Sequence, residues 1–400
     1  MNFKQLFEPI QNIILLTGGI ETLGYFSESM ADSFYDLGYH VFLFDLQTMD
    51  HTEELTHFVS SGPTALITFN FIGLSNEDIF ETDSSLSYWD LHQILCFNIL
   101  VDHPFYYYDH LLKKPSRYIQ CCIDHFHCTY MRRFYPDITP MPFLPLAGTP
   151  QEDPLLPFKD RPIDVLFTGN YTPPSTFDSY ITRLGDDYAL FYRAIIDDLL
   201  INPHQNIDTV MEHHIIKELG EISAEDKKKC MRNMIFIDLY VRFFYRGKVI
   251  RTLIDNGITV HVFGSGWDKL ECSHPENLIL GGLVDSAECI RQMRRSKLSL
   301  NIMPWFKDGA HDRVFNSMLH GALCVTDPSA YLSAEFTDHK EAIFYTLTDL
   351  DSLPSQITAL LHNASLCTQI TTEAFKKCLS RHTWSHRAHS IHTILTDLTS

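Results

Sequence analysis

The sequence predicts two α/β domains in one chain, each with a parallel β-sheet covered by helices. The chain has 400 residues, which is more than one ordinary core needs and enough for two domains of typical size. Short apolar runs alternate with stretches of helical period, as is typical of parallel sheets buried on both faces. A Pro-rich stretch, residues 140–162, separates two such series and is the best candidate for a linker.

The first series predicts a Rossmann-like N-terminal domain over residues 1–150. A helical pattern over residues 23–37 ends at Gly38, and it follows an apolar run that ends in Gly18-Gly19. Continuous apolar runs of this length, bounded by turn residues, indicate buried strands. The expected strands are residues 12–17, 40–46, 64–71, 94–101 and 118–124.

The second series predicts another Rossmann-like domain over residues 151–384. It begins with an apolar run at residues 163–168 and is interrupted at once by residues 173–245, which show only helical periodicity. We therefore expect an all-helical insertion there. The later expected strands are residues 259–264, 278–281, 298–304, 323–327 and 342–347. A last helical segment covers residues 385–400.

Composition narrows the class of protein. The formal net charge is −19, which disfavours nonspecific binding to nucleic acid or to an anionic membrane. The first residues contain no apolar run long enough for a signal peptide, and no stretch of about 20 apolar residues could span a bilayer. Ten Cys without regular spacing indicate reduced thiols. We expect a cytoplasmic protein that is not integral to a membrane and does not bind nucleic acid.

Three successive strand ends in the second series carry small or polar residues. They are Gly264-Ser265-Gly266-Trp267, Gly281-Gly282-Leu283-Val284, and a third strand end at Pro304 that leads into a turn over residues 308–312. Because ligands of doubly wound sheets bind at the carboxyl ends of strands, these turns indicate one site. The last turn precedes a helix expected from Val314 to Leu319, whose N-terminus and Arg313 suit a pyrophosphate.

Four of these segments carry a resemblance to a known family. VFGSGWDKL, GGLVDSAECIRQMRRSKLSLNIMP, HDRVFNSMLHGALCVTD and HTWSHRAHSIHTIL look like the C-terminal domain of CgeB-like glycosyltransferases, over about residues 246–395. VDHPFYYYDHL, IDHFHCTYMRRFY and FLPLAG resemble it more loosely. The resemblance implies the GT-B fold, a nucleotide-sugar donor held mainly by the C-terminal domain, an acceptor facing the N-terminal domain, and a C-terminal helix, residues 385–400, that crosses back to the first domain.

Related GT-B enzymes often carry two Glu seven residues apart, one on the donor sugar and one on the ribose. The matching positions here are Asp308 and Asn316. Asn316 brings no charge and can donate as well as accept. Asp308 could instead cap the helix, with Asn316 in solvent. The candidate donor-binding residues are Gly18, Gly19, Gly169, Asn170, Arg246, Gly264, Gly266, Trp267, Leu283, Val284, Asp308, Gly309, Ala310, His311, Asp312, Arg313 and Asn316.

The N-terminal domain offers three candidate catalytic residues. Glu21 follows Gly18-Gly19 and could be a base, or simply an acidic residue in the first turn of a helix. Asp102 and His103 follow the fourth strand, and a His beside an Asp is a common route to a general base near neutral pH. A chance pair on a loop is the alternative.

We expect no metal site. The segment from Asp124 to Cys128 has metal-binding residue types without partner spacing. Asp186-Asp187 and Asp197-Asp198 lie in helical sequence, unlike the metal motif of the other large glycosyltransferase fold. Arg313, with Arg246 and Lys248, could stabilise the leaving diphosphate instead.

The expected function is transfer of a sugar from a nucleoside-diphosphate sugar to a glycan, protein or small-molecule acceptor. No other cofactor is expected. The alternative is a non-catalytic nucleotide-sugar-binding or assembly protein of the same fold, and an epimerase is a third possibility. We expect the insertion, residues 173–245, to stand near the mouth of the cleft and to shape acceptor access; a buttress or an oligomerisation surface is the alternative.

Overall fold

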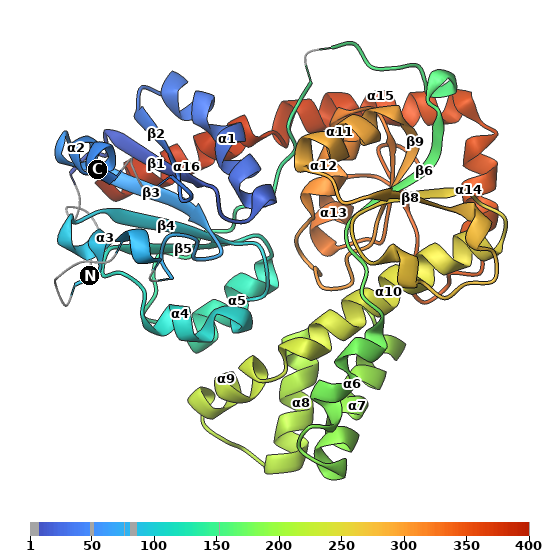
Figure 1. The fold of residues 1–400 in the computed structure, drawn as a ribbon, viewed down its shortest axis with the longest axis horizontal. Coiled ribbons are helices and arrows are strands. Elements are labelled where there is room, and N and C mark those ends of the chain that lie inside the picture. Colours follow the sequence, from blue (N-terminus) through green and yellow to red (C-terminus); the bar gives the residue numbers. More distant parts are fainter. Residues whose placement is uncertain (1–7, 49–51, 76, 81–85, 152, 400) are drawn as a thin grey trace. The chain divides into compact units, whose positions relative to one another are not determined.

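The structure, a computed structural model, describes residues 8–48, 52–75, 77–80, 86–151 and 153–399. The chain forms two compact units, one of residues 1–146 with 382–400 and one of residues 147–381. Each has its own parallel sheet (Figure 1). No helix in the described residues is long and apolar enough to cross a bilayer.

Unit 1 has five strands in the order β2-β1-β3-β4-β5, all parallel. Strands β3 and β4 are buried along their whole length, which explains their continuous apolar sequence. The strands are β1 (Asn12–Thr17), β2 (His40–Asp45), β3 (Thr64–Phe69), β4 (Leu95–Leu100) and β5 (Tyr118–Cys122). The helices are α1 (Glu21–Asp36), α2 (Thr52–Ser60), α3 (Tyr88–Leu91), α4 (Tyr108–Leu112), α5 (His125–Phe134) and α16 (Trp384–Thr399).

Helix α16 packs against α1 although most of the chain separates them in sequence. Trp384 is 2% exposed, and its ring lies 4.5 Å from that of Phe26 on α1. Tyr39 Oη lies 2.8 Å from Nδ1 of His392, in the middle of the helix. The last residues of the chain therefore complete the core of unit 1.

Unit 2 has six parallel strands in the order β11-β10-β9-β6-β7-β8. The strands are β6 (Ile163–Thr168), β7 (Val260–Phe263), β8 (Leu278–Gly282), β9 (Ser296–Asn301), β10 (Leu323–Thr326) and β11 (Ile343–Phe344). The helices are α6 (Asp178–Thr182), α7 (Asp186–Ile201), α8 (Ile207–Leu219), α9 (Ala224–Arg232), α10 (Ile235–Asp255), α11 (Ser286–Arg295), α12 (Asp312–Leu319), α13 (Ala330–Glu335), α14 (Leu353–Leu361) and α15 (Ala364–Arg381).

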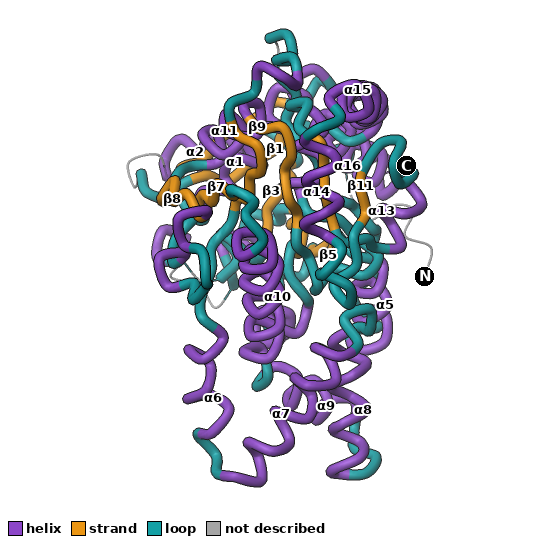
Figure 2. The backbone as a smooth tube through the Cα atoms, turned by 90° about the vertical axis from the view of Figure 1, so that its right-hand side faces the viewer, coloured by secondary structure: helices purple, strands orange, loops and turns teal. Residues whose placement is uncertain are grey.

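The helical insertion leaves the sheet after β6 and returns through α10, with α6–α9 extending beyond the sheet (Figures 1 and 2). Its expected end at Tyr245 was wrong, because α10 runs unbroken to Asp255. Buried residues such as Ile237, Val241 and Val249 continue one apolar stripe through that point. Arg246 and Lys248, which the sequence offered beside Arg313 for the leaving diphosphate, both lie inside α10.

Strands β9 and β11 each end three residues before the expected end. Strand β9 ends at Asn301 because Met303 N donates to the Asp327 carboxylate (2.8 Å) instead of continuing the strand ladder. Strand β11 ends at Phe344 because the chain turns just beyond it, where Asp349 N donates to the Thr346 carbonyl (3.3 Å).

Candidate active site

The strand order of each sheet indicates where a sheet of this kind binds a ligand. In unit 2 the chain runs from β6 through β7 to β8 in one direction, and β9 to β11 lie on the other side of β6. The strand order therefore switches between β6 and β9, where α/β sheets bind ligands at the carboxyl ends of the strands. In unit 1 the same switch lies between β1 and β3.

Arg313 occupies the switch point of unit 2. It lies in the first turn of α12, is 5% exposed, and its Nε donates to Thr168 Oγ1 at the end of β6 (3.2 Å). Its Nη1 donates to Asn301 Oδ1 at the end of β9 (2.8 Å). The guanidinium is thus fixed across both strand ends. Asn301 and Thr168 were not among the candidate residues.

Arg246 lies near the same point. Its guanidinium carbon is 5.8 Å from the centre of the Phe167 ring, and that of Arg313 is 4.8 Å from it. Arg246 Nη1 donates to the Asn170 carbonyl (2.8 Å). Two guanidiniums on one ring bring concentrated positive charge into a chain of net charge −19. Such an arrangement suits an anion with several oxygens.

His311 and Asp312 form a close pair at the start of α12. His311 Nδ1 lies 2.6 Å from Asp312 Oδ1, so the ring N–H donates to the carboxylate. The same nitrogen cannot also accept from Arg313 N, which is 3.3 Å away. Burial and the Arg313 guanidinium lower the pKa of His311. Burial raises the pKa of Asp312, but His311 and Arg313 outweigh it and lower that pKa overall.

The expected turn over residues 308–312 is held by α13. Ser329 Oγ donates to the Gly309 carbonyl (2.6 Å), and Ala330 N donates to the Lys307 carbonyl (2.8 Å). Gly309 and Ala310 are buried, while Asp308 is half-buried. The helix begins at Asp312, two residues earlier than expected, with His311 as its N-cap residue.

One of the two interpretations placed Asn316 in solvent, and the structure contradicts it. Asn316 is 3% exposed, and both ends of its amide are engaged. Oδ1 accepts from Thr149 N (2.9 Å), and Nδ2 donates to Asp312 Oδ2 (3.1 Å). Gly148 passes so close to α12 that a Cβ there would come 2.9 Å from Asn316 N. Asn316 therefore ties residues 148–149 to α12.

The glycines after β6 and β7 serve the packing of two loops against each other. A Cβ on Gly264 would lie 2.5 Å from the Gly169 carbonyl oxygen, and one on Gly266 would lie 2.1 Å from that of Tyr171. Ser265 N donates to Asn170 Oδ1 (2.9 Å). Close backbone contact thus accounts for these glycines.

Trp267 is part of the same packing. It is 2% exposed, its Nε1 donates to the Gly169 carbonyl (2.7 Å), and its ring stacks on that of Tyr171 at 5.0 Å. Leu283 differs, with 76% of its surface exposed after β8, and Val284 beside it is half-buried. Among the candidate residues that follow β6, β7 and β8, Asn170 and Leu283 have exposed side chains, whereas Trp267 is buried.

A stripe of charged residues on α10 faces the loop after β9, and of these residues the sequence analysis named Arg246 alone. Asp238 accepts from Arg242 Nη2 (2.9 Å), one helical turn away. The Trp305 ring lies 4.2 Å from the Arg242 guanidinium and 5.1 Å from that of Arg246. The spacing of four residues between Asp238, Arg242 and Arg246 was the signal available in the sequence.

Asp327, after β10, is a further buried acid that was missed. It is 5% exposed and accepts from Met303 N (2.8 Å). Burial raises its pKa to about 6, although Met303 N–H and the Lys307 ammonium act in the opposite direction. Its carboxylate fixes the backbone that leads from β9 into the 304–311 loop.

In unit 1, Gly18 and Gly19 lie after β1 as expected. Gly18 has φ +77, and a Cβ there would meet the Asp45 carboxylate at 1.9 Å. Gly19 lies against Ile72, where a Cβ would come within 3.3 Å. Glu21 is exposed in the first turn of α1, so its position also fits the interpretation as an ordinary first-turn acid.

Asp102 and His103 differ in what they can do. His103 is 6% exposed; its Nδ1 accepts from Phe105 N (3.3 Å), and its ring packs 4.8 Å from that of Tyr130. It is the N-cap residue of the turn that follows. Asp102 is half-buried, and its Oδ2 accepts from Asn70 Nδ2 (3.1 Å). Asp102 is therefore the better placed of the two for contact with a substrate.

The segment from Asp124 to Cys128 is structural. Asp124 is 1% exposed and caps α5, with its Oδ1 accepting from Phe126 N (2.7 Å). Within the described residues, no group of three or more His, Cys, Asp or Glu could hold a metal ion. Asp186, Asp187 and Asp198 lie on α7, as their helical sequence indicated.

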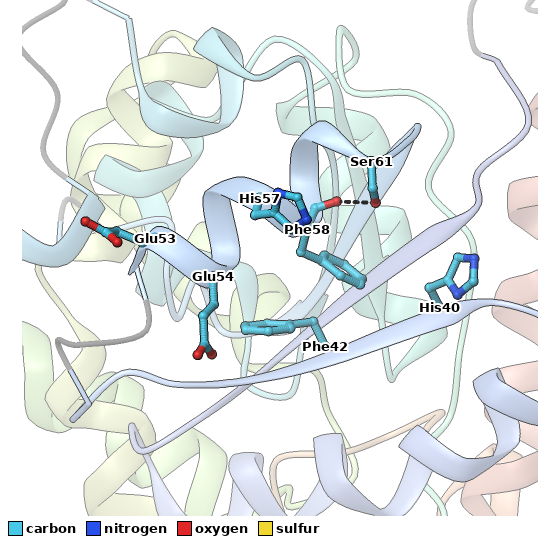
Figure 3. A pocket seen from close by; sticks show the side chains of 7 residues that line it. All are labelled: His40, Phe42, Glu53, Glu54, His57, Phe58 and Ser61. Atoms are coloured by element: carbon cyan, nitrogen blue, oxygen red, sulfur yellow. Dashed lines mark hydrogen bonds between the residues drawn. The ribbon is translucent and has the colours of Figure 1, made fainter.

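A separate pocket of about 720 Å³ lies between β2 and α2 in unit 1 (Figure 3). The Phe42 and Phe58 rings lie 5.2 Å apart in it, and Glu53, Glu54 and His57 stand around them. None of the candidate residues lines this pocket.

Comparison with known proteins agrees with this architecture. Residues 246–393 match the model of a family described as glycosyl transferase-like. A search of curated proteins found no match. An alpha-glucosyltransferase in complex with UDP and a 13-mer DNA containing a HMU base has a TM-score of 0.58 at 12% identity, covering 97% of this chain and 100% of that one. The chain has the GT-B fold.

Two further structures are similar. Sucrose-phosphate synthase from Thermosynechococcus elongatus has a TM-score of 0.50 at 8% identity, covering 97% of this chain and 99% of that one. TarM has a TM-score of 0.46 at 13% identity, and 84% of this chain covers 55% of TarM, so the chain spans about half of that protein. The expected fold class is thus confirmed by the full-length neighbours.

Proposed function

We propose that this GT-B protein is a glycosyltransferase that moves a sugar from a nucleoside-diphosphate sugar to an acceptor hydroxyl without a metal ion. The observation that carries the proposal is the pair of guanidiniums, Arg246 and Arg313, on the Phe167 ring at the switch point of unit 2. A diphosphate leaving group carries the charge that such a pair stabilises. The glycosyl transferase-like sequence of residues 246–393 covers both.

The donor site in this proposal is built from unit 2. Arg246, Arg313 and the N-terminus of α12 face the diphosphate, and exposed Leu283 with half-buried Val284 offers apolar surface for the base. Asp308, at the start of the turn that precedes α12, contacts the sugar. The finer resemblance to CgeB-like proteins remains part of this proposal.

The acceptor is a hydroxyl of a glycan, a protein or a small molecule in this proposal. Some neighbours were solved with DNA. The net charge of −19 argues against a nucleic-acid acceptor here, because phosphate backbones are bound through clustered Lys and Arg. All ten cysteines are free thiols, which fits a cytoplasmic location.

A binding assay tests the donor site. A panel of nucleoside diphosphates is titrated in EDTA while Trp fluorescence is followed, because Trp305 lies against Arg246. We expect binding of at least one diphosphate, and Arg246→Ala to raise its Kd about 10- to 100-fold, the loss of one or two charge-assisted hydrogen bonds. Arg251→Ala, an exposed position on the same helix, is the matched control. Absence of binding to every diphosphate would refute the donor site.

A second experiment separates transfer from binding alone. The engagement of Asn316 by Thr149 and Asp312, where related enzymes carry Glu, keeps a non-catalytic nucleotide-sugar-binding protein as the other candidate. Release of free nucleoside diphosphate is measured with the donor and a panel of acceptors. Release that Arg246→Ala abolishes supports the enzyme; binding without release supports the non-catalytic protein, and an epimerised donor without acceptor would indicate an epimerase.

A further inference from the structure

The turn after β3 in unit 1 has a strained backbone. Asn70 and Phe71 have φ of 50° and 62°, so two consecutive residues other than glycine occupy the left-handed region. Asn tolerates this region, whereas Phe does so rarely. The turn lies beside Gly19 at the switch point of the unit 1 sheet, since Gly19 packs on Ile72. Strain that persists at such a position is often part of a functional site.

Surrounding groups hold the turn in place. Phe71 N donates to Asn98 Oδ1 on β4 (3.0 Å), and Asn98 Nδ2 donates to Tyr118 Oη on β5 (2.9 Å). The Phe71 ring stacks with those of Tyr107 at 5.7 Å and Tyr118 at 5.8 Å. Asn98 is fully buried, so this support comes from the sheet itself. These contacts fix the backbone and the ring of Phe71, the residue next to Asn70.

The side chain of Asn70 links this turn to Asp102 by hydrogen bonds. Its Oδ1 accepts from Val101 N (2.9 Å), and its Nδ2 donates to Asp102 Oδ2 (3.1 Å). Because one end of the amide must accept, the other must donate, and the amide cannot flip without losing both bonds. Tyr107 Oη stands 3.5 Å from the same carboxylate oxygen. Asn70 therefore sets the direction of the Asp102 carboxylate.

We propose that Asn70 is the positioning residue for Asp102, and that Asp102 is the base that activates the acceptor; this inference rests on the proposed glycosyl transfer. The acceptor oxygen forms a bond to the anomeric carbon as the bond from that carbon to the diphosphate oxygen breaks. The diphosphate leaves with the electron pair of that bond, and the hydroxyl proton passes to the Asp102 carboxylate. The strained turn keeps that carboxylate in one orientation through the Asn70 amide.

A double-mutant cycle tests whether Asn70 acts through Asp102. The four proteins are the wild type, Asn70→Gly, Asp102→Asn and the double variant. Gly adopts the positive φ without strain, so Asn70→Gly keeps the turn and removes only the side-chain bridge. Gln93→Gly is the matched control, because Gln93 has φ 54° in the same unit and its side-chain Oε1 accepts from Arg117 Nη2 (3.3 Å).

We expect Asp102→Asn to lower kcat about 100- to 10,000-fold, the range for loss of a general base. Asn70→Gly should lower kcat about 10-fold with the Kd of the nucleoside diphosphate unchanged, and should have little further effect on Asp102→Asn. Gln93→Gly should leave kcat unchanged. Effects of Asn70→Gly that add fully to those of Asp102→Asn, or a kcat that Asn70→Gly does not change, would overturn the positioning role.

The outcome also separates this inference from the proposed function. Transfer that survives Asp102→Asn at the wild-type rate overturns the inference and leaves glycosyl transfer intact. If the wild type transfers no sugar, the proposed function fails and Asp102 has no acceptor to activate. Equal urea midpoints for Asn70→Gly and the wild type show that a lower kcat does not come from unfolding.

Discussion

Asn316 donates from its side-chain amide to the Asp312 carboxylate across one turn of α12, with 3.1 Å between Nδ2 and Oδ2. The other end of the amide accepts from Thr149 N. Asn316 stands where related enzymes often carry a donor-binding Glu. Both ends of its amide are hydrogen-bonded, and they link α12 to Thr149. A carboxylate at position 316 would lie beside the carboxylate of Asp312.

We therefore expect Asn316→Asp to destabilise the protein by about 2–3 kcal/mol at pH 7, because it removes a donor and places two buried carboxylates together. Asn316→Glu should behave similarly and should not raise transfer. Urea unfolding measures both. The double variant Asp312→Asn with Asn316→Asp restores one donor and one acceptor, so it should recover most of the loss. A stable Asn316→Asp would show that the link contributes little.

Gly266 tests the explanation of the loop glycines as packing residues. Gly266→Ala brings a Cβ to 2.1 Å from the Tyr171 carbonyl oxygen at φ +83. Gly257→Ala meets nothing within 4 Å at φ +80, so it carries the backbone strain without the clash. We expect Gly257→Ala to cost about 1 kcal/mol and Gly266→Ala at least about 2 kcal/mol more. Equal losses in urea unfolding would contradict the packing explanation.

Much of the fold could be predicted from the sequence because parallel strands buried on both faces appear as apolar runs. Strand β3 is an example, buried along its whole length. The local sequence pattern did not predict the end of a strand where groups distant in the sequence determine it. Strand β9 ends early because Met303 N–H donates to the carboxylate of Asp327, a residue that follows β10.

The candidate residues show the same limit. Arg313 was singled out as a phosphate ligand, but its fixed position depends on Thr168, which is 145 residues away in the chain. The glycines at 264 and 266 suggested ligand contact, yet backbone packing requires them. Asn70 left no sign at all, because a positive φ at a residue other than glycine is set by tertiary support, which Asn98 gives to the neighbouring Phe71.

The helical insertion contacts the loop next to the candidate donor residues. Lys307 Nζ donates to the carbonyls of Pro203, between α7 and α8, and Pro304. The sequence alone suggested a role on the acceptor side, whereas these contacts favour a role in holding the donor loop. We expect Lys307→Gln to raise the Kd of the nucleoside diphosphate about 10-fold, the loss of one charge-assisted bond.

Lys217→Gln, at an exposed position on α8 of the insertion, is the control for the charge change. Both variants are compared by titration of nucleoside diphosphate and by transfer rate. Unchanged diphosphate affinity with lost transfer in Lys307→Gln would instead support the acceptor-side role of the insertion.

His320, after α12, predicts a pH dependence of stability. Its Nε2 lies 3.0 Å from the Thr149 carbonyl, so that nitrogen donates. His320 Nδ1 lies 3.1 Å from Gln151 Oε1, and the Nε2 of the same amide has no hydrogen-bond partner in this orientation of the amide. Exchanging the two ends of that amide lets it donate to Nδ1 and satisfies both groups. The neutral imidazole therefore fits this buried place, and burial lowers the pKa of His320 to about 4.

Because this pKa lies below the ordinary value of 6.5, the unfolded chain binds the proton first as the pH falls. The contribution of His320 to stability is complete above about pH 6.5 and is lost as the pH falls to about 4, by roughly 3 kcal/mol in all. Asp327 acts in the opposite direction, because its pKa is raised to about 6 and its folded form takes up a proton over an overlapping range. His320→Gln isolates the histidine: the difference in unfolding free energy between the wild type and this variant should narrow from pH 7 to pH 4.5. A constant difference would mean that His320 titrates normally in the folded protein.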